Sequence, residues 1–338
     1  MSFPWNRCHA VLCKWAGSAE GKVVHEPPRL QEDFMTAVLK SGWSRPSTIL
    51  FASEVPTNEK AFAFALAQAV EFGAKLILFH AFDVDDGSLM ETEHLELLAE
   101  RVQSAGVECK IVVRQGMAAE QILAYARDRK VDRIVMGTHS PGPIGKLLVG
   151  SVAEAVLRSS VAPVCVIGPD VVDGRYRNFA TRTILCGASL HASSKQVVRF
   201  AAELAAEQDA RLILQNVIRP QERAEILASR SVGEIEAELR ALIPTKYQGK
   251  FIVLSTVLSG DPTEELLYQS LAQQADLIVL GAQGASAFAA ITRQGVVYKV
   301  LAHAQCPVMT LSPVVLAACG AKEEMAYAPA EAFLAGVF

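Results

Sequence analysis

The chain has 338 residues, of which 51% are apolar and 20% charged, and its formal net charge is −4. This composition is typical of a globular protein, and the length suits two domains. No cluster of lysine and arginine provides the positive face that nucleic acid or an anionic membrane requires, so we expect neither as a partner. No apolar stretch reaches the roughly 18 residues that span a bilayer, and the N-terminus lacks a signal-peptide pattern. We therefore expect a cytoplasmic protein.

Residues 1–45 form an N-terminal extension, with a helix-like segment at 29–42. Apolar runs and helix-like segments then alternate up to residue 168. The predicted strands are 48–52, 75–81, 108–116, 132–137 and 162–168, and the predicted helices are 58–73, 88–106, 118–130 and 151–160. The strands are continuous apolar runs, which indicates burial on both faces of a parallel sheet.

The same order of elements returns between residues 183 and 311, with an additional helical region at 219–242. The predicted strands are 183–187, 211–217, 250–260, 276–281 and 306–311, and the other predicted helices are 193–208, 262–274 and 296–304. An alanine-rich tail follows at 315–338. Strands that alternate with helices of this length predict an α/β protein with doubly wound sheets.

The two halves are copies of one another. Residues 132–169 align with 276–313 without a gap, at an offset of 144, and 10 of the 38 positions are identical. Upstream, "EFGAKLIL" (71–78) matches "EQDARLIL" (207–214). A single offset that persists through a whole motif indicates a duplicated domain. We therefore predict a first domain at 46–170 and a second at 180–314.

Seven cysteines are scattered along the chain without a CxxC pair. Cys109, Cys165, Cys186 and Cys306 lie in or beside apolar runs, where cysteine acts as a small hydrophobic residue. Cys8 and Cys13 lack the further cysteine or histidine that a zinc site needs. We expect structural cysteines and no metal site built from them.

A ligand in an open doubly wound sheet binds beyond the carboxyl ends of the strands. No GxGxxG follows the first strand and no GxxxxGK[ST] is present, and no GxSxG elbow anchors a catalytic triad. What remains is the loop "GTHSPGPIGKLLVGS" (137–151) after the fourth strand. Gly137 permits close approach to the backbone, and the helix that follows Gly150 and Ser151 favours an anion at its N-terminus. A plain strand–loop–helix joint capped by Ser151 explains the residues equally well.

The spacing G-x2-G-x9-G-[ST], followed by "SVAEAVLRSSVAPVCVI" (151–167), resembles the universal stress protein family, and so does "TILFASEVPTNEKAFAFALAQAVEFGAKLILFHAF" (48–82). The resemblance covers about 48–168 and 183–312. It implies two Rossmann-like domains, each a five-stranded parallel sheet of order 3-2-1-4-5. It also implies that the two domains pair through their last strands as an intrachain pseudo-dimer.

Some members of this family bind ATP or AMP in the cleft, and Mg would accompany ATP. By resemblance the cofactor-binding positions in the first copy are Ala52, Ser53, Glu54, Ala81, Gly137, His139, Ser140, Gly150, Ser151 and Val152. Glu54 replaces the family's usual Asp, and Ser140 replaces its middle glycine.

In the second copy Ser189 stands at the position of Glu54, and the ungapped alignment places Gln294 and Gly295 opposite Gly150 and Ser151. This predicts a degenerate second site whose domain serves as the pairing partner. We expect a stress-response protein that binds an adenine nucleotide in its first domain and has no catalytic residues. The alternatives are a ligand-free module that binds partner proteins, and a weak enzyme that hydrolyses ATP or transfers adenylyl groups.

Overall fold

The computed structural model describes residues 43–54, 57–82, 88–138, 150–172, 181–190, 194–282 and 295–319, with backbone only at 88–92. All of them belong to one compact unit, Ala37–Phe338. The helix expected at 29–42 and Cys8 and Cys13 lie outside the described residues. None of the described helices is both long and apolar enough to cross a membrane.

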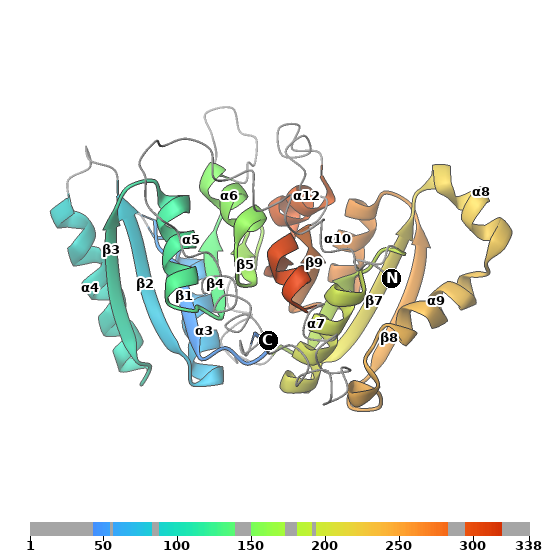
Figure 1. The fold of residues 1–338 in the computed structure, drawn as a ribbon, viewed down its shortest axis with the longest axis horizontal. Coiled ribbons are helices and arrows are strands. Elements are labelled where there is room, and N and C mark those ends of the chain that lie inside the picture. The colour runs from blue at the N-terminus through green and yellow to red at the C-terminus, as the bar shows by residue number, and fades with distance from the viewer. Residues whose placement is uncertain are drawn as a thin grey trace, which may run out of the picture. The chain divides into compact units, whose positions relative to one another are not determined.

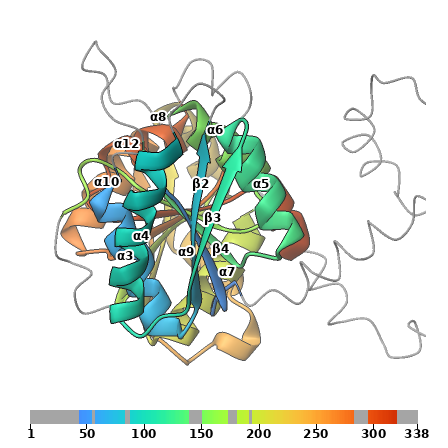
Figure 2. The same cartoon turned by 90° about the vertical axis from the view of Figure 1, so that its left-hand side faces the viewer.

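The first repeat folds as predicted, with element ends within a few residues of the expected ones. Its strands are β1 (Thr48–Ala52), β2 (Lys75–Phe82), β3 (Cys109–Gln115), β4 (Arg133–Gly137) and β5 (Val164–Ile167), and its helices are α3 (Glu59–Phe72), α4 (Ser88–Ser104), α5 (Ala118–Asp128) and α6 (Ser151–Ser159). Figure 2 shows α3 and α4 on one side of β2 and β3, with α5 on the other.

The second repeat has the same elements and two additional helices. Its strands are β6 (Thr183–Gly187), β7 (Arg211–Ile218), β8 (Val253–Ser259), β9 (Leu277–Gly281) and β10 (Val308–Leu311), and its helices are α7 (Ser194–Gln208), α8 (Pro220–Ser229), α9 (Val232–Ala241), α10 (Pro262–Ala272) and α12 (Val296–His303). The helical region expected at 219–242 is the pair α8 and α9. Residues 313–319 form a further helical segment.

The ten strands form one sheet, in the order β3-β2-β1-β4-β5-β10-β9-β6-β7-β8 (Figure 1). Within each repeat all neighbours are parallel and the order is the expected 3-2-1-4-5. β5 and β10 pair antiparallel, with Met309 opposite Cys165. This pairing joins the two repeats edge to edge, and it removes two apolar strand edges from solvent.

Central strands are buried on both faces, whereas the outer strands β3 and β8 consist mostly of exposed and partly buried residues. They are sheet edges, so one face of each is only partly covered. Burial raises the pKa of the thiols of Cys165 in β5 and Cys186 in β6 to about 12, so both are unreactive core residues.

Arg133 is a charged residue in the interior of the first repeat, and none of its surface is exposed. One of its guanidinium nitrogens donates to the carbonyl oxygen of Trp43 at 2.9 Å, and another donates to the side chain of Gln68. Its guanidinium carbon lies 5.3 Å from the centre of the Phe72 ring. Arg133 therefore ties the segment that precedes β1 to the core of the first repeat. In the second repeat the same offset places Leu277 at this position.

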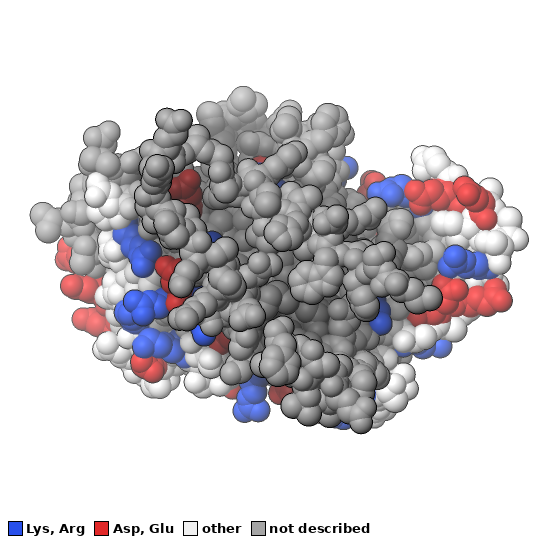
Figure 3. All heavy atoms as spheres, viewed as in Figure 1, with Lys and Arg blue, Asp and Glu red and all other residues white. Residues whose placement is uncertain are grey.

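The additional helices of the second repeat carry charges of both signs. Acidic and basic side chains lie interspersed over α8 and α9 in Figure 3. Ion pairs connect Arg230 with Glu238 at 2.9 Å and Arg240 with Glu236 at 3.7 Å. α8 has no buried residue. Such exposed pairs contribute little stability, so this helical pair is held mainly by the apolar side of α9 against β8.

Candidate functional site

The carboxyl ends of β1, β2 and β4 converge in the first repeat. Ala52 pairs with Phe79 on β2 and with Met136 on β4. The next residues along each strand therefore lie side by side beyond the sheet, and the predicted positions Ser53, Glu54, Ala81 and Gly137 are brought together there. β1 is also where the strand order reverses, which is where doubly wound sheets bind their ligands.

Hydrogen bonds fix the backbone at this point. His80, only 6% exposed, donates from Nδ1 to the carbonyl oxygen of Ser53 at 3.1 Å. The Thr57 hydroxyl bonds to the carbonyl oxygen of Glu54 at 3.3 Å and to Nε2 of His94 on α4. The sequence alone assigned no role to Thr57 or His94. No sequence signal points to His94, because only the tertiary fold brings α4 to this loop.

Gly137 is required by packing. A Cβ at this position would collide with the side-chain amide of Asn58, which is the N-cap of α3 and accepts from the Ala61 N–H at 3.1 Å. Gly281, its counterpart, is crowded in the same way by Val197 of α7, whose Cγ2 would be 2.9 Å from an added Cβ. The close approach that both glycines permit is therefore made by the helix after the first strand of each repeat. The N-cap pattern of Asn58 before α3 is the signal that would have found it.

The N-terminus of α6 has no side-chain cap. Gly150 is the N-cap residue, with φ −62° and ψ 158°, and no side-chain cap hydrogen bond is present. Ser151 is the first helical residue and is exposed, and Val152 is partly buried. Ser151 therefore does not act as the cap that the plain structural interpretation expected. Within the part of the chain that the structure describes, Gly150 provides no side-chain cap, so the first N–H groups of α6 can bind solvent or an anion. His139 and Ser140 lie outside the described residues.

The corresponding cleft of the second repeat is a cavity of about 730 Å³. It lies where the carboxyl ends of β6, β7 and β9 meet the first turns of α7, α10 and α12. Its walls are Gly187, Ala188, Ser189, Ser194, Val197, Gln215, Asn216, Val217, Arg219, Pro262, Leu266, Leu280, Gly281, Gly295, Val296, Val297 and Leu316. Its volume is within the range of small-molecule sites, about 300–1,000 Å³.

The structure corrects the ungapped alignment at the start of α12. Gly295 is the N-cap residue, with φ −67° and ψ 143° and no side-chain cap hydrogen bond. It therefore matches Gly150, and Val296 rather than Gly295 stands where Ser151 does. The second repeat keeps the bare helix start and loses the hydroxyl. Gln294 lies outside the described residues.

The hydrogen bond that holds the backbone after the first strand is present in both repeats, but a different side chain makes it in each. Asn216, at the position of His80, donates to the carbonyl oxygen of Ala188 at 2.9 Å. Ser189, at the position of Glu54, bonds through its N–H and its hydroxyl to Ser194 Oγ, both at 2.8 Å. The second cleft thus has no carboxylate where the first has Glu54. Among the residues that the structure describes, no group of three or more His, Cys, Asp or Glu residues is arranged to hold a metal ion.

Two doubly wound domains joined through their last strands make this chain a tandem Rossmann-like protein. The model of the universal stress protein family matches residues 47–168 and again 180–312. The chain belongs to the universal stress protein family, as a tandem two-domain member.

Relatives agree with this assignment. A universal stress protein of Thermus aquaticus is 35% identical over 133 residues, which are 36% of this chain and 97% of the relative. Universal stress protein MJ0531 of Methanocaldococcus jannaschii is 31% identical over 119 residues, 30% of this chain and 70% of the relative. The crystal structure of a universal stress protein from Archaeoglobus fulgidus has the same fold, with a TM-score of 0.59 at 17% identity over 79% of this chain and 98% of that one.

Proposed function

We propose that the first repeat binds an adenine nucleotide, ATP or AMP, and that the protein acts as a nucleotide-dependent stress-response protein of the cytoplasm. The observation that carries this proposal is the uncapped N-terminus of α6 at Gly150, at the end of the loop that leaves the switch point of the sheet. Free N–H groups and the positive end of a helix dipole favour phosphate at such a position.

Eight of the ten predicted residues have a stated role in this proposal. Glu54 contacts the ribose and adenine end, and Ala81 forms an apolar wall beside it. Gly150, Ser151 and Val152 hold the phosphates, with Mg accompanying ATP. His139 and Ser140 complete the phosphate loop. Gly137 serves the site by letting Asn58 pack beneath it.

The second repeat is the pairing partner, through β5 and β10. We propose binding rather than catalysis as the activity, because the converging residues of the first repeat offer one carboxylate, and the Thr57 hydroxyl beside His94 donates its proton to the Glu54 carbonyl oxygen and not to the imidazole. Nucleotide would act by changing which surface the protein presents to a partner.

Isothermal titration calorimetry with ATP, ADP and AMP, with and without Mg²⁺, tests the proposal. Gly150→Asp is the sharpest variant, because Asp is a good N-cap whose carboxylate takes the free N–H groups and repels phosphate. We expect ATP binding by the natural protein and its loss in Gly150→Asp, with helix α6 intact by circular dichroism. Gly295→Asp, the matched change in the second repeat, should leave ATP binding unchanged.

Two results would contradict the proposal. One is the absence of a heat signal for all three nucleotides at millimolar concentration. The other is ATP affinity that is unchanged in Gly150→Asp. In either case a ligand-free module that binds partner proteins becomes the better interpretation.

A further inference from the structure

We propose that the outer strand β8 pairs antiparallel with β8 of a second copy of this chain, which gives a two-fold symmetric dimer with one continuous sheet. This interface uses a different edge of the second repeat from the one that pairs β10 with β5. It does not depend on the nucleotide site proposed for the first repeat.

The first step is the free edge of β8. This strand ends the sheet at the outer side of the second repeat (Figure 1), and within the part of the chain that the structure describes it pairs only with β7. The carbonyl oxygen of Ile252 and the N–H of Gly260 both bond to β7. The even-numbered residues of β8 therefore direct their N–H and C=O groups toward β7. The N–H and C=O groups that point to the free edge belong to Val253, Ser255, Val257 and Ser259.

The second step is the comparison with β3, which ends the sheet on the other side. Lys110 and Arg114 lie on β3, and Glu108 precedes it directly. Charged side chains on an outer strand oppose pairing with another chain. The offset of 144 that relates the repeats replaces all three with apolar residues, Ile252, Leu254 and Leu258. β8 has the sequence VLSTVLS and carries no charge, so the device that protects β3 is missing from it.

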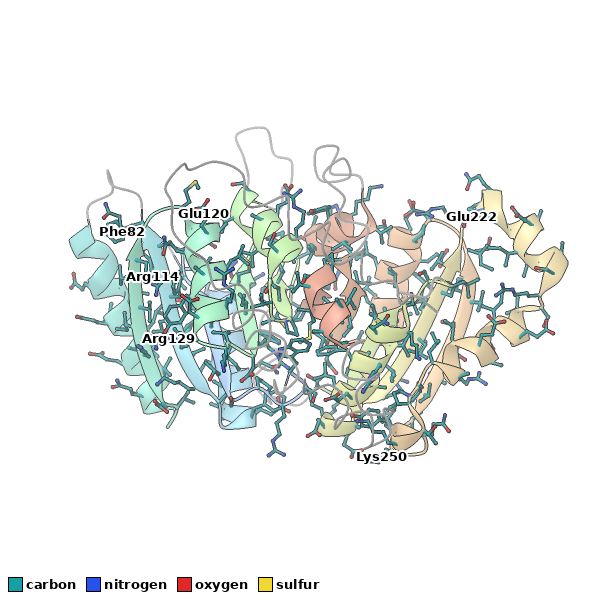
Figure 4. All side chains as sticks on the ribbon, in the orientation of Figure 1. Phe82, Arg114, Glu120, Arg129, Glu222 and Lys250 are labelled. Carbon is teal, nitrogen blue, oxygen red and sulfur yellow. The ribbon has the colours of Figure 1, made fainter. Side chains whose placement is uncertain are left out.

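The apolar residues of β8 are incompletely covered. Leu254 and Leu258 lie on the same face of the strand, because they are four residues apart. Arg114, at the position of Leu258, has its guanidinium carbon 5.0 Å from the centre of the Tyr125 ring on α5 (Figure 4). The corresponding face of the second repeat is the α10 face. α10 packs against β7 and α12, and 39% of Leu254 and 67% of Ile252 remain exposed. An apolar strip along a free strand edge favours an interaction site.

The occupant that fits this edge is the same strand of a second copy. In antiparallel pairing centred on Thr256, the four residues with outward N–H and C=O groups lie opposite one another and exchange main-chain hydrogen bonds. Leu254 of one copy then lies opposite Leu258 of the other as an apolar cross-strand pair, and Thr256 lies opposite its own copy. Each contact occurs twice, as the two-fold axis of a dimer requires.

Charge distinguishes this occupant from the alternatives. β8 paired with itself brings no like charges together. The same pairing of β3 would place Lys110 of one copy opposite Arg114 of the other, which is unfavourable. β8 paired with β3 of another copy would leave free edges at both ends and extend into chains. The protein already uses this type of contact, because the four-residue strands β5 and β10 pair antiparallel, and β8 offers seven residues.

Sedimentation velocity of the full chain over the micromolar range tests the proposal, and we expect a dimer. The double variant Leu254→Lys, Leu258→Arg gives β8 the charges of β3 and places them opposite one another across the two-fold axis. We expect it to raise the dissociation constant of the dimer by roughly a hundredfold or more. Val257→Pro removes an N–H that points to the free edge and leaves the bonds to β7, so it should raise the constant by roughly tenfold or more. Circular dichroism checks that both variants keep the fold.

Val113→Pro is the matched control variant. Val113 occupies the position of Val257, because it lies opposite His80 of β2 as Val257 lies opposite Asn216 of β7. The same substitution is thus made at the other end of the sheet. This variant should form the dimer as the natural protein does.

The remaining outcomes overturn the proposal. A natural protein that sediments as a monomer throughout the micromolar range does not pair through β8. A dimer that persists unchanged in the double variant and in Val257→Pro is formed elsewhere on the surface. Oligomers larger than a dimer that both Val113→Pro and Val257→Pro dissociate are formed by β3 with β8. None of these results bears on nucleotide binding by the first repeat, which calorimetry measures separately.

Discussion

The two repeats have the same strand order, but different side chains lie beneath the carboxyl ends of their strands. In the first, Phe79 on β2 and Tyr125 on α5 form an aromatic pair, both almost fully buried, and the guanidinium of Arg114 lies 5.0 Å from the Tyr125 ring. Figure 4 labels Arg114 on β3, the neighbouring strand. In the second, Gln215 and Gln269 occupy the positions of the two aromatic residues.

This difference shows that the strand pairing does not depend on which side chains lie beneath the carboxyl ends of the strands. The main-chain hydrogen bond that follows the first strand, from Ser53 N–H to Phe79 O and from Ala188 N–H to Gln215 O, is 2.8 Å long in both repeats. Strand order, crossovers and the pairing through β5 and β10 are set by apolar runs and backbone bonds. The side chains at the strand ends are therefore free to diverge, and that is where the two repeats differ in chemistry.

The largest expected effect comes from imposing the second repeat's residue on the first. Phe79→Gln removes a buried aromatic contact and buries an amide, so we expect it to lower the free energy of unfolding by about 5 kcal/mol. Guanidinium denaturation followed by circular dichroism measures this change. A loss below about 2 kcal/mol would contradict this expectation and show that the position of Phe79 tolerates a buried amide, as the position of Gln215 does.

Arg133 provides the next comparison, because Leu277 replaces it in the second repeat. Arg133→Leu removes the bonds to Trp43 and Gln68, and it leaves Glu71 without its compensating charge. Burial already raises the pKa of Glu71, and the Arg133 charge partly lowers it again. We expect a loss of about 3 kcal/mol, as when one partner of a buried charged group is deleted.

Denaturation of Arg133→Leu, of Gln68→Leu and of the double variant measures how much of that loss is shared. The sum of the two single losses in free energy of unfolding should exceed the loss of the double variant, because each single variant already removes the bond between Arg133 and Gln68. Fully additive losses would show that Arg133 stabilises the repeat without using Gln68.

Gln215→Leu should act in the opposite direction. Replacing an amide whose buried polar atoms have no partner among the described residues with an apolar side chain of similar volume should raise the free energy of unfolding by about 1–3 kcal/mol. The measurement is denaturation without any ligand. A destabilised Gln215→Leu would mean that the amide stabilises the fold through a contact outside the described residues.

Sequence alone predicted the fold well because the signals were regular. Continuous apolar runs such as 48–52 and 183–187 form buried strands at the predicted positions. The resemblance to the family implied the strand order, and the repeat implied that the order occurs twice. The helix at 219–242 was less well predicted, since the break between α8 and α9 depends on the cap at Ser231, whose side chain accepts from the Glu234 N–H.

The candidate site was only partly predictable. Ser53, Glu54, Ala81 and Gly137 could be placed together because parallel strands end at one edge of a sheet. The packing of Asn58 against Gly137 depends on tertiary geometry, and the ungapped alignment could not show that Gly295 is the N-cap of α12. The polarity of Gln215 was visible in the sequence, but its lack of a partner appears only when the surrounding side chains are placed.

The smallest predicted effect concerns the aspartate that begins the fourth strand of each repeat. Asp132 accepts from the N–H and hydroxyl of Ser47 and from the N–H of Thr48, at 2.7–3.0 Å. Asp276 accepts from the N–H groups of Arg182 and Thr183, at 2.9 and 3.0 Å. Each aspartate connects the start of the fourth strand of its repeat to the start of the first strand, but Asp132 accepts one additional hydrogen bond. One hydrogen bond contributes about 1 kcal/mol, so Asp132→Ala should destabilise the chain by about 1 kcal/mol more than Asp276→Ala. Denaturation of Asp132→Ala in a Ser47→Ala background isolates that bond, because there the two aspartate changes should cost the same. A difference that persists without the Ser47 hydroxyl would place its origin in the deeper burial of Asp132 instead.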